Sequence, residues 1–311
     1  MSGGVLGRRG MLLAGVGVLA GCSGSSSGAA DGRGTSVPTP TVSGASRSSP
    51  AAGSPSPNSP GSPGSAAPTV ALPSVRSWAP GPGEIEPAAK RVAVAAAVQL
   101  LRPRGTRGVV EVIDAQYGGI LTDTASVLVP CRVYTIVSGR VVTGGATVDV
   151  RLTKNQGSWR VTATHPSRPG PAAPRLSAAA RQVLANERIL LPPASAADIR
   201  SGQVHDTVLR AMLELATTYQ IGVSVIRSGH PRNVFGTNRR SDHPQGRAFD
   251  TWQINGRAVV APSTPRSLIT SYLRASAAAG SYNVGGPYQL AGATYFSDRT
   301  HQDHTHAGFR P

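Results

Sequence analysis

The sequence predicts an α+β protein whose folded part consists of two regions that follow a long segment without folding signals. Stretches with helical periodicity, such as residues 84–101 and 204–220, alternate with short runs of β-branched and apolar residues separated by glycine-containing turns. The length of 311 residues, with 37 glycines and 26 prolines, indicates two modest domains and an unfolded part rather than one large core.

Residues 1–22 have the pattern of an export signal. Arg8 and Arg9 precede an apolar stretch of about ten residues, which is too short for a permanent membrane span. The stretch LAGC that ends at Cys22 resembles a bacterial lipobox, which implies that Cys22 is the lipidated first residue of the mature chain. We therefore expect a lipid anchor at the extracytoplasmic face of a cell membrane. An ordinary cleaved signal peptide remains the alternative, and Sec and twin-arginine export both stay open.

Residues 23–83 consist mostly of Ser, Gly, Pro, Ala and Thr. Such a segment buries too little apolar surface to offset the entropy of ordering it, so we expect a disordered tether. If Cys22 carries lipid, Cys131 has no disulfide partner. Its apolar surroundings, ASVLVPCRVYTIV, indicate a buried structural thiol rather than a reactive one.

The chain is basic, with 31 Lys+Arg against 15 Asp+Glu and a net charge of +16. A basic surface suits an acidic partner such as anionic lipid or cell-wall polymer. Nucleic acid is a poor alternative, because the chain has an export signal, few aromatic residues and no basic block of the kind that binds phosphates. The sequence therefore predicts a membrane or cell-wall partner and no nucleic acid.

Residues 84–166 are predicted to form a small α+β domain. A helix is expected over 84–101, with Pro87 tolerated in its first turn. A helix followed by antiparallel strands loosely resembles the NTF2-like or cystatin-like shape. The region shows no cluster of titratable residues typical of a site. Its strands are expected at 109–117, 125–137, 146–154 and 158–164.

Residues 167–175, SRPGPAAPR, are the expected domain boundary, and residues 175–311 form the second predicted α+β domain. The helix expected over 204–220 has one apolar face, formed by Val208, Leu209, Met212 and Leu215. Further helices are expected at 176–189 and 267–280, with strands at 221–226 and 247–252 and a strand region over 293–309.

The histidines concentrate where a metal site would need them, because five of the seven lie between residues 230 and 306. A catalytic zinc ion takes three protein ligands at about 2.0 to 2.2 Å and leaves one position open. His243, Asp250 and one histidine of the late HTH stretch supply two nitrogens and a carboxylate. Residues seven apart on a strand face opposite sides. Pro244 and Gly246 are the residue types that allow the bend this requires.

His304 and His306 share one face if the final region is a strand. One of them is then placed to bind a metal and the other to assist catalysis. On the same ideal strand Asp303 and His301 point away, which makes both weaker candidates. We interpret His230 and His301 as hydrogen-bonding residues of the site wall rather than as ligands.

Two motifs together resemble a known family. The pattern SxHxxGxAxD, at residues 241–250, and the late HxH, at residues 304–306, resemble zinc peptidases of the D-Ala-D-Ala carboxypeptidase and murein endopeptidase group, also called the LAS or M15-like group. The resemblance covers residues 215–311 and implies a hedgehog/LAS-type α+β fold. An upstream SGYRS-type element has an echo in VIRSGH, where Arg227 precedes Ser228 and Gly229.

Carried onto this sequence, the family pattern makes His243, Asp250 and His306 the ligands of Zn²⁺. His304 takes the place of the residue that assists catalysis. Many relatives have Glu three residues before the last ligand, and Asp303 stands there, so the base remains divided between Asp303 and His304. The family's arginine corresponds approximately to Arg227, which could stabilise developing charge on the substrate or grip its carboxylate.

The resemblance and the compartment together imply a zinc metallopeptidase that hydrolyses peptide bonds of peptidoglycan, as a DD-carboxypeptidase or an endopeptidase. Zinc would lower the pKa of a bound water to about 7 and polarise the peptide carbonyl. Two alternatives stay open: a non-catalytic module that binds peptidoglycan peptides, and a scaffold lipoprotein whose first domain recruits a membrane partner.

Overall fold

The computed structural model describes residues 70–311. The expected export signal, the lipidation site Cys22 and most of the expected tether lie outside these residues. Five α-helices and two β-sheets occur within the described part of the chain, which confirms the α+β class. Among the same residues, no helix combines the length and apolarity that crossing a membrane requires.

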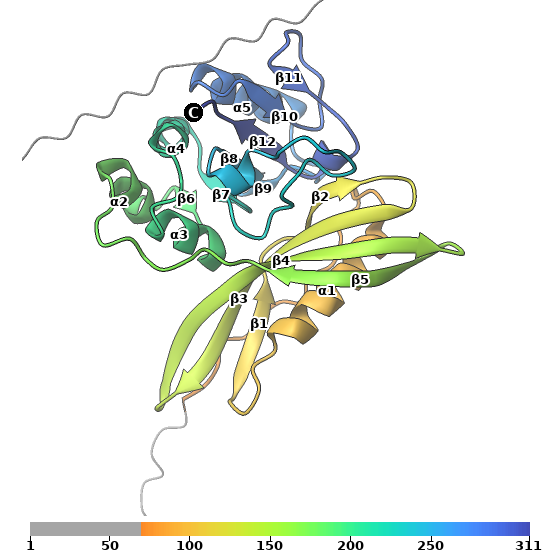
Figure 1. Cartoon of the computed structure of the whole chain (residues 1–311), viewed down its shortest axis with the longest axis vertical. Coiled ribbons are helices and arrows are strands. Elements are labelled where there is room, and N and C mark those ends of the chain that lie inside the picture. Colours follow the sequence, from red (N-terminus) through yellow and green to blue (C-terminus); the bar gives the residue numbers. More distant parts are fainter. Residues whose placement is uncertain (1–69) are drawn as a thin grey trace, which may run out of the picture. The chain divides into compact units, whose positions relative to one another are not determined.

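The first sheet is formed by residues 108–166 and is antiparallel throughout, with the order β1-β3-β4-β5 and β2 paired to β3. The helix α1 (Pro87–Leu101) packs against β3, β4 and β5 on one face of this sheet (Figure 1). Proline stands at the start of α1, where its missing N–H has no helical partner. The strands are β1 (Gly108–Val112), β2 (Gln116–Ile120), β3 (Thr124–Val137), β4 (Arg140–Asn155) and β5 (Ser158–Pro166).

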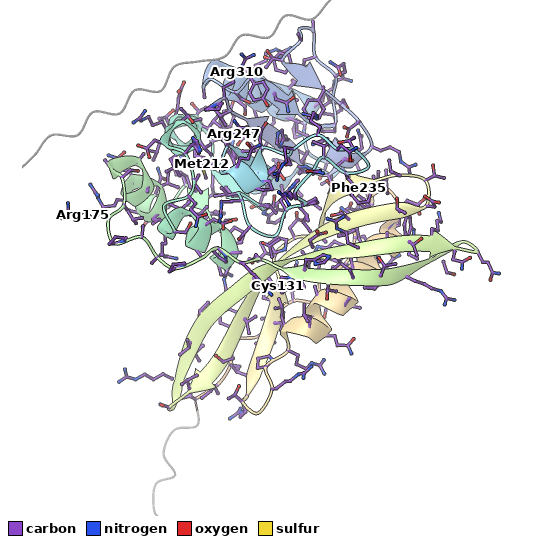
Figure 2. All side chains as sticks on the ribbon, in the orientation of Figure 1. Cys131, Arg175, Met212, Phe235, Arg247 and Arg310 are labelled. Carbon is purple, nitrogen blue, oxygen red and sulfur yellow. The ribbon has the colours of Figure 1, made fainter. Side chains whose placement is uncertain are left out.

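The core of this part lies between α1 and the sheet. Ala89, Ala93 and Ala97 recur at every fourth position of α1 and are fully buried, so the helix backbone approaches the strands closely. Cys131 on β3 is also fully buried, as expected from its apolar surroundings (Figure 2). Trp78 packs against the same core, so the folded part begins before residue 83, where the sequence had indicated the end of the tether.

The second sheet is mixed and runs in the order β11-β10-β12-β8-β7-β6, with β9 paired to β8. Its long central strand is β8, which pairs with β12 on one side and β7 on the other. Its strands are β6 (Ile189–Leu190), β7 (Ile221–Val223), β8 (Ala248–Ile254), β9 (Arg257–Ala258), β10 (Asn283–Gly285), β11 (Tyr295–Phe296) and β12 (Thr305–Gly308).

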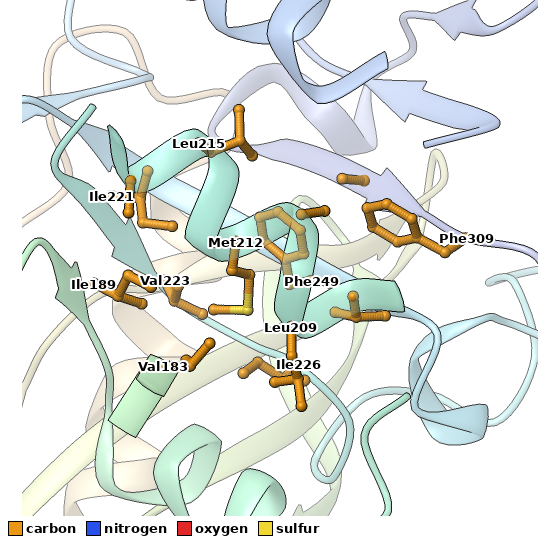
Figure 3. Close-up of a cluster of buried hydrophobic side chains, with 14 of the residues drawn as sticks. Val183, Ile189, Leu209, Met212, Leu215, Ile221, Val223, Ile226, Phe249 and Phe309 are labelled. Atoms are coloured by element: carbon orange, nitrogen blue, oxygen red, sulfur yellow. The ribbon is translucent and has the colours of Figure 1, made fainter. Parts of the chain in front are cut away.

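Helix α4 carries the core of the second sheet. The four apolar residues predicted for its inner face are all buried, and Leu209 and Met212 lie near Phe249 of β8 (Figure 3). Burying a side chain of this size stabilises the fold by about 1.5 to 3 kcal/mol. The α-helices of this part are α2 (Ala178–Ala185), α3 (Pro193–Arg200), α4 (Asp206–Thr218) and α5 (Arg266–Ala278), and the 3₁₀ turns are η1 (His243–Gln245) and η2 (Thr300–Gln302).

The region 293–309, expected to be one strand region, divides into three elements. Strands β11 and β12 are separated by the 3₁₀ turn η2, in which His301 has φ −96° and ψ 33°. The alternation of faces that holds on a strand therefore does not apply to His301 or Asp303, which precede β12.

Burial makes Cys131 a poor nucleophile, because it raises the pKa of the thiol to about 12. Since the thiolate is the reactive form, a rise from 9.0 leaves about a thousandfold less of it at pH 8. In a Cys22→Ser variant, we expect Cys131 to resist iodoacetamide in the folded protein and to react completely in denaturant, as measured by mass spectrometry. Equal labelling rates in the two conditions would contradict this burial.

Candidate functional site

Three side chains predicted as metal ligands meet in the second sheet. Asp250 on β8 and His306 on β12 are Cα partners in the antiparallel ladder, so their side chains leave the sheet side by side. His243 opens η1, just before β8. All three are buried, with exposed fractions of 1%, 8% and 1% for Asp250, His306 and His243.

The donor atoms of this triad lie at nearly equal distances from one another. His243 Nε2 lies 3.1 Å from His306 Nδ1 and 3.1 Å from Asp250 Oδ1, and His306 Nδ1 lies 3.0 Å from the same oxygen. A tetrahedral zinc ion with bonds of about 2.0 to 2.1 Å places its ligands about 3.3 Å apart. The spacing therefore fits shared coordination of one ion.

The hydrogen bonds around the triad also favour a cation at its centre. His243 Nδ1 lies 2.8 Å from the carbonyl oxygen of Ile226, so Nδ1 carries the proton and Nε2 presents a lone pair. The lone pair of His243 and the carboxylate oxygen of Asp250 then face each other. A single proton on His306 can satisfy only one of these acceptors, whereas a metal ion satisfies all three groups.

A second set of residues also could hold a metal ion. His230, His243 and Asp250 bring one ligand atom each within 4.8 Å of one another. The set with His306 is tighter, with all three distances at or below 3.1 Å. We therefore take His306 rather than His230 as the third member, in agreement with the sequence pattern.

The turn before β8 brings His243 back over the sheet. The predicted bend is present: Pro244 lies in η1, and Gly246 ends it with φ 69° in the left-handed region. A Cβ atom on Gly246 would lie only 1.9 Å from the carbonyl oxygen of Gln203. Both the backbone conformation and the close contact require glycine here.

The charge state of the triad suits metal ligation. Burial alone would raise the pKa of Asp250, but His243, His304 and the hydrogen bonds to its carboxylate hold that pKa well below its usual range. Burial lowers the pKa of His306 to about 4, so its imidazole is neutral at pH 7. Burial and the neighbouring His243 likewise keep the pKa of His230 well below its usual value.

His304 stands behind the triad with Asp303 as its partner. Its Nδ1 lies 2.6 Å from Asp303 Oδ1, and its Nε2 lies 3.8 Å from Asp250 Oδ2. Burial lowers the pKa of His304, but Asp250 and Asp303 outweigh it and raise that pKa above its usual value. Asp303 therefore contacts the imidazole of His304 rather than the triad.

Asp303 is itself part of a buried ionic cluster with the first sheet, where the sequence had suggested no site. Lys90 Nζ lies 2.6 Å from Asp303 Oδ2 and also pairs with Glu84. Burial would raise the pKa of Asp303, but Lys90 and His304 hold it below its usual range. Burial raises the pKa of the neighbouring Asp114 to about 7.

His301 and His230 line the cleft beside the triad. His301 Nδ1 lies 2.7 Å from Asp298 Oδ1, and its ring centroid lies 5.8 Å from that of His306. The ring of His230 stacks on His243, with centroids 4.1 Å apart. Both residues are wall residues as expected, but His301 is better placed than the strand pattern indicated, because η2 turns it into the cleft.

The structure does not bring Arg227 to the triad. Its guanidinium donates to the carbonyl of Pro169 and to Gln203, and it lies 3.7 Å from Asp198. It lines a neighbouring pocket rather than the cleft of the triad. The sequence element VIRSGH therefore does not place an arginine next to the triad.

The cleft next to the triad has a volume of about 410 Å³. His243 and His306 form part of its wall, so one side of the triad faces the cleft. Arg239 and Arg299, whose side chains end in guanidinium groups, also line this cleft. Such groups bind carboxylates through paired hydrogen bonds, so the cleft suits an extended ligand with an anionic group.

The chain matches no family model, no curated protein and no solved structure.

A comparison of Gly246 with Gly256 separates the effect of a left-handed backbone from the effect of a steric contact. Both have positive φ, 69° and 75°, but a Cβ atom on Gly256 meets nothing within 4 Å. We expect Gly256→Ala to lower the free energy of unfolding by about 1 to 2 kcal/mol, the usual strain of the left-handed conformation. Gly246→Ala should lose more, because of the clash with Gln203. Urea denaturation of both variants measures this, and equal losses would contradict the role of the contact.

Proposed function

We propose that residues 175–311 form a zinc-dependent peptidase domain that hydrolyses peptide bonds of peptidoglycan at the outer face of a cell membrane. The observation that carries the proposal is the convergence of His243, Asp250 and His306, whose donor atoms lie within 3.1 Å of one another beside a cleft. The expected hedgehog/LAS-type fold and the NTF2-like shape of residues 84–166 belong to the same proposal.

Zinc is the favoured ion because of the donor set. Two imidazole nitrogens and one carboxylate oxygen suit zinc and other late transition metals, whereas Mg²⁺ and Ca²⁺ prefer oxygen ligands. Three protein ligands leave one position open, as in catalytic zinc sites. The cleft adjoins the triad and supports an open fourth position on that side.

When bound, zinc would activate water at neutral pH and polarise the scissile carbonyl. The protein supplies two imidazoles for proton transfer. His304, held by Asp303, has its Nε2 3.8 Å from Asp250 Oδ2, and its raised pKa favours holding a proton. His301, held by Asp298, faces the cleft and is placed to hand a proton to a leaving amine.

Substrate binding is assigned to the cleft. In place of Arg227, we propose that Arg239 and Arg299 bind a carboxylate of the peptide, since both line the cleft. The substrate class rests on the family resemblance and on the predicted compartment. The lipid on Cys22 would hold the protein at the membrane, and the tether would let the folded part reach the cell wall.

A second candidate function is a closed metal site that only binds peptidoglycan peptides. The observation that favours it is the proximity of His230 to His243 and Asp250, within 4.8 Å. Structural zinc sites have four protein ligands and no open position. His230 as a fourth protein ligand would therefore occupy the position that hydrolysis requires for water.

The metal site predicts about one equivalent of zinc per purified chain. We expect His243→Ala to lose most of this zinc after dialysis, because one of three ligands is removed. His205→Ala is a matched control, because His205 is an exposed histidine of the same region. Plasma mass spectrometry measures zinc content. A zinc-free wild type, or equal zinc in both variants, would refute the site.

Hydrolysis predicts that the full chain converts peptidoglycan peptides into shorter products. These products should disappear with a chelator and return with added zinc, as followed by liquid chromatography and mass spectrometry. His304→Ala should slow turnover by about 10²- to 10⁴-fold, the usual contribution of a proton-transfer group. Peptide binding with bound zinc but without products would favour the binding module, and chelator-resistant products would rule out the zinc mechanism.

A further inference from the structure

Resting on the proposed zinc site, we infer that residues 84–166 are a working part of that site. In this arrangement Gln116 orients the ligand Asp250, and Lys90 holds Asp303 against His304. Both are positioning residues supplied by the first sheet and its helix, a region in which the sequence showed no site.

Gln116 contacts the carboxylate oxygen of Asp250 that does not face His243 and His306. It lies on β2 and is fully buried, and its Nε2 donates to Asp250 Oδ2 at 2.6 Å. Asp250 Oδ1 is the oxygen that faces His243 and His306. Because Gln116 holds Oδ2, Oδ1 keeps its orientation toward the proposed metal position.

The orientation of the Gln116 amide is set from the other side. The hydroxyl of Ser224 donates to Gln116 Oε1, which leaves Nε2 to face the carboxylate. The backbone N–H of Ser224, which directly follows β7, also donates to the Asp250 carbonyl at 3.0 Å. Ser224 therefore orients the side-chain amide of Gln116, and this amide in turn contacts the carboxylate of Asp250.

Lys90 performs the corresponding role behind His304. It is fully buried in α1, and burying an ammonium group is costly unless it is paired. Its Nζ contacts Asp303 Oδ2 at 2.6 Å, and the backbone N–H of Tyr117 donates to the same oxygen at 3.0 Å. The first region thus fixes Oδ2 of Asp303, which leaves Oδ1 to hold the imidazole of His304.

The backbone of β2 also comes close to the cleft. A Cβ atom on Gly119 would lie 2.0 Å from Cβ of Phe235, so only glycine permits this approach. Gly118, Ile120 and Leu121 line the cleft together with Phe235. The strand that carries Gln116 is therefore also one wall of the space that a substrate would occupy.

The test of Gln116 is zinc affinity in the full chain, measured by competition with a chelator of known affinity. Gln116→Met keeps the volume and removes the donor, and we expect zinc binding about 10- to 100-fold weaker, as for other groups that orient ligands. Ser224→Ala should weaken it in the same direction but less. Gln99→Ala, an exposed glutamine on α1, is the control and should match the wild type.

The test of Lys90 separates turnover from binding. Lys90→Met should lower kcat toward the tested peptide, with zinc content retained and KM changed little, because it acts through Asp303 and His304 rather than through the ligands. Asp303→Asn keeps the shape of the carboxylate and should give the same split if Lys90→Met does not fold. A change in KM alone, or an unchanged kcat, would overturn this part of the inference.

Failure of the proposed function and failure of this inference would give different results. If the wild type takes up no zinc, the proposed function and this inference both fall. If the wild type binds zinc and cleaves peptide, but Gln116→Met and Ser224→Ala bind zinc as the Gln99→Ala control does, only the inference on Gln116 falls.

Discussion

The carboxylate of Asp250 is the group around which the site is organised. It is almost completely buried, and a carboxylate in such surroundings is costly unless each oxygen has a partner. His243 and His306 lie against one oxygen and Gln116 against the other. Because His306 pairs with Asp250 across the strand ladder, the register of two strands sets this geometry. On the side away from Gln116, His243 and His306 line the cleft.

The same contacts connect the two sheets. Pairing buried charges contributes little net stability, because desolvation offsets most of the attraction. The contacts of Lys90 with Asp303 and of Gln116 with Asp250 therefore contribute little to the stability of the fold. Their main effect is to orient the side chains of Asp303 and Asp250. Apolar packing around each sheet supplies the stability instead. The polar contacts between the two sheets can therefore position side chains of the site without being needed for most of the stability.

The convergence of His243, Asp250 and His306 could be predicted from sequence because these residues lie in short motifs, and the bend at Gly246 follows from residue type. The contacts of Gln116 and Lys90 with the site could not be predicted, because each residue contacts a partner far along the chain and neither stands in a local pattern. His301 was undervalued for another reason: the periodicity of a strand was applied to residues that form a 3₁₀ turn. Arg227 was overvalued because a partial motif carries residue types without carrying their position. Local rules therefore predicted the residues that converge but not the long-range contacts that the first region makes with them.

The occupant of the fourth coordination position of the proposed metal distinguishes a hydrolase from a closed metal site. An imidazole binds a metal through a lone pair in the plane of its ring, so the ion lies in the plane of each ligand ring. The rings of His230 and His243 are stacked, with centroids 4.1 Å apart and an angle of 15° between their planes. Two stacked planes cannot both contain one ion. In the proposed site, His230 would therefore have to turn away from this stacking before it could bind the same ion as His243, and without that turn the position next to the cleft would be open to a small ligand.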